Sequence, residues 1–135
     1  MTRLLAAALT ATGIAACAGQ PMVAERNPRA EARLAQALAG KVAGPPISCL
    51  PSFRTNQIEV IDRDTILYRD GRTSYVQHTN GSCYPSGSNS GTFLVMRKFG
   101  TSALCRGDIA HVHDTASRMF AGSCSFNAFI PYRMP

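Results

Sequence analysis

Several residue types and motifs with well-known chemistry are missing from this sequence. The 135-residue chain has no tryptophan, and its five cysteines include no C-x-x-C pair, which excludes a thioredoxin-like redox centre and the usual zinc knuckles. Phosphate-binding loops and dinucleotide fingerprints are absent, and the nearest approach to a G-x-S-x-G hydrolase motif, residues 87–91, has asparagine at its centre. A chain of this length is too short for a TIM barrel or a kinase, so one small domain is expected.

The charge balance is basic but does not have the pattern of a nucleic-acid binder. Lys+Arg number 14 against 8 Asp+Glu, which gives a formal net charge of +6. The basic residues are scattered along the chain, whereas nucleic-acid binders gather them on one stripe together with aromatic residues. We therefore expect no nucleic-acid partner and interpret the excess as a solvated surface with some attraction to anionic lipid headgroups.

The N-terminal segment is typical of a secretory signal. Arg3 precedes an apolar run, residues 4–16, that is too short to span a bilayer as a permanent helix. The run leads into Ile14-Ala15-Ala16-Cys17, which resembles the lipobox of bacterial lipoproteins. The resemblance implies cleavage before Cys17, acylation of that residue and, because Ala18 follows it, sorting to the outer membrane facing the periplasm. Ordinary secretion to the periplasm, with cleavage at Ala16-Cys17-Ala18, is the alternative.

A helix and a domain boundary are expected after this segment. Asn27-Pro28 is a favourable cap and first-turn pair, and Gly40 is a typical helix end. The apolar stripe of this helix is thin, so we expect only loose docking. Gly44-Pro45-Pro46 interrupts regular structure. The predicted segments are a signal peptide over residues 1–16, a lipid-anchored tether with a short helix over 17–44, and a β domain over 45–135.

From residue 47 onward, the apolar pattern has a period of two, which is typical of strands. Asp70-Gly71 is a strong hairpin signal. Strands are expected over residues 57–61, 65–69, 73–78, 92–98, 108–113 and 125–130. Their short, even spacing predicts a mainly β fold: a small antiparallel barrel or sandwich of about five or six strands, preceded by one short N-terminal helix.

The four cysteines after Cys17 are predicted to form two disulfides, because an even count behind a secretory signal indicates an oxidising compartment. Three pairings are possible. We expect Cys83–Cys105, which brackets the fourth strand, and Cys49–Cys124, which joins the two ends of the domain. The longer loop predicts that losing Cys49 destabilises the domain more than losing Cys83. Acylation of Cys17 accounts for the remaining thiol.

His111 and His113 are the strongest candidates for a catalytic site. Residues at i and i+2 of a strand share a face, so both rings could bind one metal, with His78 as a third candidate ligand. Asp108 and Asp114 flank the pair and are either ligands or ordinary turn residues. Two histidines do not complete a metal site, so we assign no metal, no cofactor and no catalytic residue.

A wider set of residues resembles a family of small secreted bacterial proteins of unknown function. The resemblance covers about residues 44–135 and implies a four-cysteine β fold outside the cytoplasm, without an assigned activity. The motifs that carry it are Ile47-Ser48-Cys49 with Arg54, residues 60–68, Cys83-Tyr84-Pro85, residues 104–108, Gly122-Ser123-Cys124 and residues 129–133.

These observations favour a lipid-anchored envelope domain that binds a protein or an envelope polymer, or gives structural support. The alternative is a metal-dependent hydrolase that uses His111 and His113.

Overall fold

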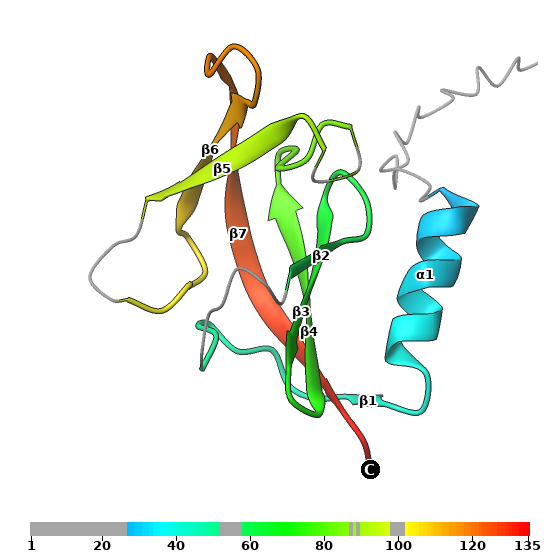
Figure 1. Cartoon of the computed structure of the whole chain (residues 1–135). Helices are drawn as coiled ribbons and strands as arrows, with labels where there is room; N and C mark the ends of the chain where they lie inside the picture. Colours follow the sequence, from blue (N-terminus) through cyan, green and yellow to red (C-terminus); the bar gives the residue numbers. More distant parts are fainter. Residues whose placement is uncertain (1–26, 52–57, 87, 89, 98–101) are drawn as a thin grey trace, which may run out of the picture.

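The computed structural model describes residues 27–51, 58–86, 88, 90–97 and 102–135. Within these residues the chain forms one helix and seven strands (Figure 1), which confirms the mainly β fold with a short N-terminal helix. The elements are α1 (Pro28–Leu38), β1 (Val42–Ala43), β2 (Ile58–Val60), β3 (Thr65–Asp70), β4 (Thr73–Asn80), β5 (Thr92–Arg97), β6 (Ile109–Asp114) and β7 (Phe120–Arg133).

The strands form a single antiparallel sheet that curls into a half-barrel (Figure 1). Its strand order is β2-β3-β4-β7-β6-β5, and β1 pairs with the C-terminal end of β7. The 14-residue strand β7 is the centre of the fold, because it pairs with β1, β4 and β6. β7 begins at Phe120, five residues before the predicted start at residue 125.

The curled sheet has an inner face that carries the main core. Directly opposed residues on antiparallel strands point to the same face, so Tyr68 and Tyr75 project together, as do Val60 and Ile66. Phe126 and Phe129 of β7 fill the centre of this inner face, where the Phe129 ring meets Tyr68 edge-on at 5.8 Å. Alternation along each strand places the remaining residues on the opposite, outer face.

Helix α1 covers one half of the outer face. Ala30 and Leu34 are buried against Ile61, Leu67 and Val76 in a second core cluster. The guanidinium of Arg33 donates to the Val60 carbonyl at 2.6 Å. Two buried helix residues and one side-chain hydrogen bond thus join α1 to the sheet.

The chain between the helix and the main sheet stays in contact with β7. The Gly44 amide donates to the Pro131 carbonyl at 2.7 Å, and Ile47 exchanges two backbone hydrogen bonds with Phe129. The prolines at 45 and 46 thus lie within a segment that follows the central strand. Helix, connection and sheet form one packed unit.

The predicted disulfide pairing is wrong, although all four cysteines are bonded. The bridges are Cys49–Cys105 and Cys83–Cys124. Strand β7 lies between β4 and β6, so Cys124 comes next to the segment that follows β4, which contains Cys83. Cys49 instead forms a β-bridge with Cys105. Long-range strand order, which is absent from the cysteine spacing, decides the pairing.

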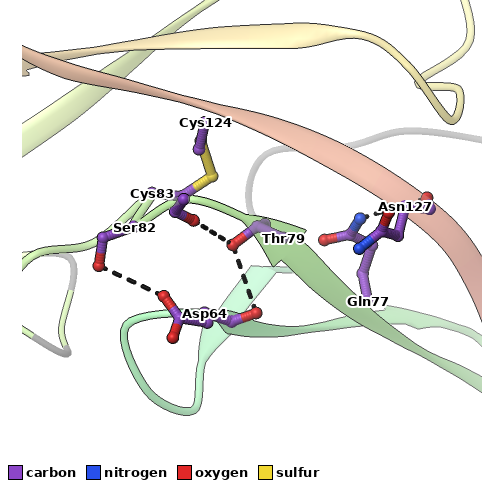
Figure 2. The surroundings of a disulfide bond; sticks show 8 residues. Asp64, Gln77, Thr79, Ser82, Cys83, Cys124 and Asn127 are labelled. Carbon is purple, nitrogen blue, oxygen red and sulfur yellow. Dashed lines mark hydrogen bonds between the residues drawn. A yellow bond between two sulfur atoms is a disulfide. The ribbon is translucent and has the colours of Figure 1, made fainter. Parts of the chain in front are cut away.

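Hydrogen bonds fix the chain around the Cys83–Cys124 bridge (Figure 2). The Thr79 hydroxyl donates to the Gly81 carbonyl at 2.8 Å and lies 3.3 Å from the Asp64 carbonyl. The Ser82 hydroxyl is 3.4 Å from the Asp64 carboxylate. The β2–β3 turn is thereby tied to the segment that carries Cys83.

Replacing Gly81 in this segment is expected to destabilise the domain. Its φ of 79° lies in the left-handed region, and an added Cβ would lie 3.0 Å from the Ser123 carbonyl oxygen. Gly71 has a similar φ of 58° but open space around it, so Gly71→Ala is the matched control. We expect Gly71→Ala to lower the free energy of unfolding by about 1 kcal/mol and Gly81→Ala by roughly 2–3 kcal/mol. Urea unfolding measures both, and equal losses would contradict the close contact.

Candidate functional site

The outer face of β5, β6 and the start of β7 presents aromatic and histidine side chains. Two cross-strand rows form it: Phe93 opposes His113, which opposes Phe120, while Val95 opposes His111. We call these five residues the aromatic–histidine surface.

Strand register places this surface on the same face of the sheet that the helix covers elsewhere. Val76, beneath the helix, and Asn80 share one face of β4, because they are an even number of residues apart. Asn80 opposes Ser125, and Ser125 opposes Ile109. Ile109, His111 and His113 therefore continue the outer face beyond α1.

The rings of the surface contact one another. Phe93 stacks on His113 with centroids 5.4 Å apart and an interplanar angle of 21°. Phe120 lies 6.0 Å from His113 and 5.7 Å from His111. The Arg118 guanidinium lies 5.4 Å above the Phe93 ring, within the range of a cation–π interaction. This preorganised aromatic cluster holds a cation at one end.

Large apolar side chains at this end of the molecule face solvent. Val95 is 45 % exposed, Phe120 is 59 % exposed and the adjacent Met119 is 69 % exposed. Within the part of the chain that the structure describes, β5 makes extensive contacts with β6 alone, and β6 with β5 and β7. These exposed apolar side chains, beside the ring cluster, are the candidate contact site for another molecule.

One aspartate organises the β6–β7 turn that leads into Phe120. The Asp114 carboxylate accepts from the Ala116 and Ser117 amides at 3.0 and 2.7 Å and from the Ser117 hydroxyl at 2.9 Å. The bonds from the Ser117 amide and hydroxyl hold the pKa of Asp114 below its usual value. Arg118 then adopts a φ of 60°, the only positive φ among the described non-glycine residues.

The histidines share a face as their spacing predicts, but the structure does not complete a metal site around them. His78 lies on β4, separated from β6 by β7, so the strands that carry these histidines are about 10 Å apart. Its ring is 3.3 Å from the Thr65 hydroxyl. Across the described ranges, no group of three or more His, Cys, Asp or Glu side chains could hold a metal ion.

The two flanking aspartates have structural partners. Asp108 is buried, and its carboxylate accepts from the Cys105 amide at 2.8 Å, beside the Cys49–Cys105 bridge. Asp114 organises the β6–β7 turn. Burial raises the pKa of Tyr68 and of Tyr84 further above neutral pH.

A second polar cluster lies in a hollow between α1 and the β2 edge. Glu59 pairs with Arg69 and, at 3.7 Å, with Arg33. All three side chains are a third or more exposed, so these ion pairs contribute at most about 1 kcal/mol each. We interpret them as helix-docking contacts.

Comparison of the chain with protein-family models, with curated proteins and with solved structures finds no significant match. The resemblance to the four-cysteine family therefore stays a prediction. The two disulfides indicate an oxidising, extracytoplasmic compartment. None of the helices in the described residues is long and apolar enough to cross a membrane. The predicted acylation site, Cys17, lies outside the described residues.

Proposed function

We propose that this chain is a non-catalytic binding domain of the bacterial envelope, and that the aromatic–histidine surface is its contact site. The observation that carries the proposal is the uncovered outer face, on which stacked rings and exposed apolar side chains continue the sheet beyond α1. The helix covers Leu67 and Val76 on this face, whereas Val95 and Phe120 stay exposed beyond it.

The chemistry of this surface supports binding. Aromatic side chains supply a large apolar contact area at low cost in conformational entropy, and arginine is their usual companion in contact surfaces. His111 and His113 contact Phe120, and His113 also stacks on Phe93. The rings thus have packing roles that need no metal.

The lipobox-like sequence supports anchoring at the membrane. A lipid on Cys17 would hold the domain on the periplasmic side of the outer membrane, as the residue after the cysteine implies. The disulfides fit this compartment, because the periplasm is oxidising. Simple secretion to the periplasm remains the alternative location.

Cys17→Ser is expected to abolish acylation and release the protein from the membrane fraction. Serine lacks the thiol that receives the diacylglycerol. Ala18→Ser, which leaves the cysteine in place, is the matched control and keeps the lipid. Intact-mass measurement of each variant, recovered from the soluble and the membrane fractions, tests both expectations.

One result would overturn the lipid anchor, and another would overturn the non-catalytic binding function. An unmodified mass for the membrane-derived wild type would remove the anchor. Stoichiometric zinc in the purified protein that disappears in His111→Ala would replace the binding function with the metal-dependent hydrolase.

A further inference from the structure

We infer that the partner of the aromatic–histidine surface is an anionic phospholipid membrane, and that the tip formed by Arg118, Met119 and Phe120 docks on it. The inference rests on the proposed function and names the partner of that site. It makes the N-terminal lipid and the hairpin tip two attachments of one domain to one bilayer.

The composition of the tip fits the interface of a membrane. Met119 and Phe120 are its two most exposed large apolar side chains, and side chains of this kind enter the boundary between headgroups and acyl chains. Arg118 lies beside them over the Phe93 ring. An apolar pair next to an arginine matches a surface with lipid tails below and phosphates above.

The positive charge of the chain adds a longer-range attraction. Cleavage before Cys17 removes Arg3, so the mature chain keeps 13 Lys+Arg against 8 Asp+Glu, a formal net charge of +5. Cationic proteins are drawn to the negative potential of anionic lipid surfaces. Within the β6–β7 turn, the one carboxylate is that of Asp114, which accepts hydrogen bonds from turn residues. The guanidinium of Arg118 is the cation that the tip presents.

The backbone of Arg118 supports a role beyond folding. A φ of 60° is a conformation that glycine or asparagine adopts at lower cost than arginine. Such strained residues are typical of functional sites, where the side chain is retained despite its conformational cost.

The position of the tip fits the predicted anchor. In Figure 1 the β6–β7 hairpin forms the upper end of the molecule, α1 begins in the upper half, and the C-terminus lies at the bottom. Ten peptide steps join Cys17 to Asn27, and they span at most about 35 Å when fully extended. A lipid on Cys17 would therefore keep Asn27, at the start of α1, within about 35 Å of the bilayer.

The absence of tryptophan gives a direct test. Phe120→Trp places a single indole reporter at the tip, and Val42→Trp places one at the opposite end, on a residue of similar exposure, 62 % against 59 %. Both proteins, as processed by the cells that produce them, are mixed with vesicles of phosphatidylglycerol and phosphatidylethanolamine. Emission spectra and quenching by brominated acyl chains are measured, and intact mass records whether each protein carries lipid.

We expect a blue shift and quenching for Phe120→Trp and neither for Val42→Trp. Adding Arg118→Gly to the reporter should weaken binding to the anionic vesicles about fivefold and leave binding to phosphatidylcholine vesicles unchanged. Glycine adopts a φ of 60° at lower cost than arginine, so we expect this variant to fold although it loses the contact with Phe93.

The outcomes separate this inference from the anchor. A lipid-modified protein whose tip reporter shows no shift would overturn the inference and leave the anchor in place. A shift in protein without lipid would support the inference and remove the anchor. Equal blue shifts at both reporter positions would overturn the inference. A blue shift that depends on protein concentration in the absence of vesicles would also overturn it, because that result assigns the surface to a second copy of the chain.

Discussion

Replacing Cys83 and Cys124 together by serine is expected to destabilise the domain more than the same change at Cys49 and Cys105. Closing the 41-residue separation contributes about 4 kcal/mol in the chain-entropy model. Both Cys83 and Cys124 are buried, at 0 % and 3 % exposure, so serine also places hydroxyls in the core, where each unpaired one costs about 1–3 kcal/mol. The sum approaches the whole stability of a typical small domain, about 5–15 kcal/mol.

The Cys49–Cys105 bridge is the internal control. Its separation of 56 residues gives a similar closure contribution, about 4 kcal/mol, but Cys49 is exposed and Cys105 is only half-buried. Its double-serine variant should therefore lose little beyond the closure contribution. Urea unfolding of the two double-serine variants, each beside its double-alanine counterpart, measures the difference.

The expected order reverses the one that the predicted pairing implied, in which Cys49 mattered more than Cys83. If the Cys49–Cys105 serine variant proves the less stable of the two, burial is not the deciding factor and the argument fails. A melting temperature that does not change when reductant is added would contradict both bridges.

Local sequence patterns predict the strands well where they alternate. The strands over Thr65–Asp70 and Thr92–Arg97 each end within one residue of their predicted limits. The pattern does not predict the first residues of strand β7, because Ala121, Gly122 and Ser123 show no apolar alternation. They extend the strand because β6 is available as a pairing partner.

The candidate site was predictable only in part, for the same reason. The i and i+2 rule places His111 and His113 on one face, and this holds in the structure. No local rule brings Phe120 to them, because an irregularity in the β6–β7 register next to His113 makes Phe120 its partner. Pairing across strands, including that of the cysteines, depends on the strand order of the whole sheet.

Leu34→Asp is expected to lower the free energy of unfolding by about 3–5 kcal/mol. Leu34 is buried against Ile61, Leu67 and Val76, so a carboxylate at this position either stays desolvated or undocks the helix. Ala35→Asp is the matched control, since it puts the same residue on the exposed side of α1 and costs at most about 0.7 kcal/mol in helix propensity. Urea unfolding again gives both values.

This comparison also tests how the domain is held at the membrane. If α1 is part of the packed unit, the predicted anchor joins a rigid body at Asn27, and the hairpin tip keeps a fixed relation to it. If both variants lower the free energy of unfolding equally little, the helix is not packed on the sheet and does not orient the domain. In that case Leu34→Asp should leave the Phe120→Trp response unchanged. If the helix is packed, Leu34→Asp should weaken that response.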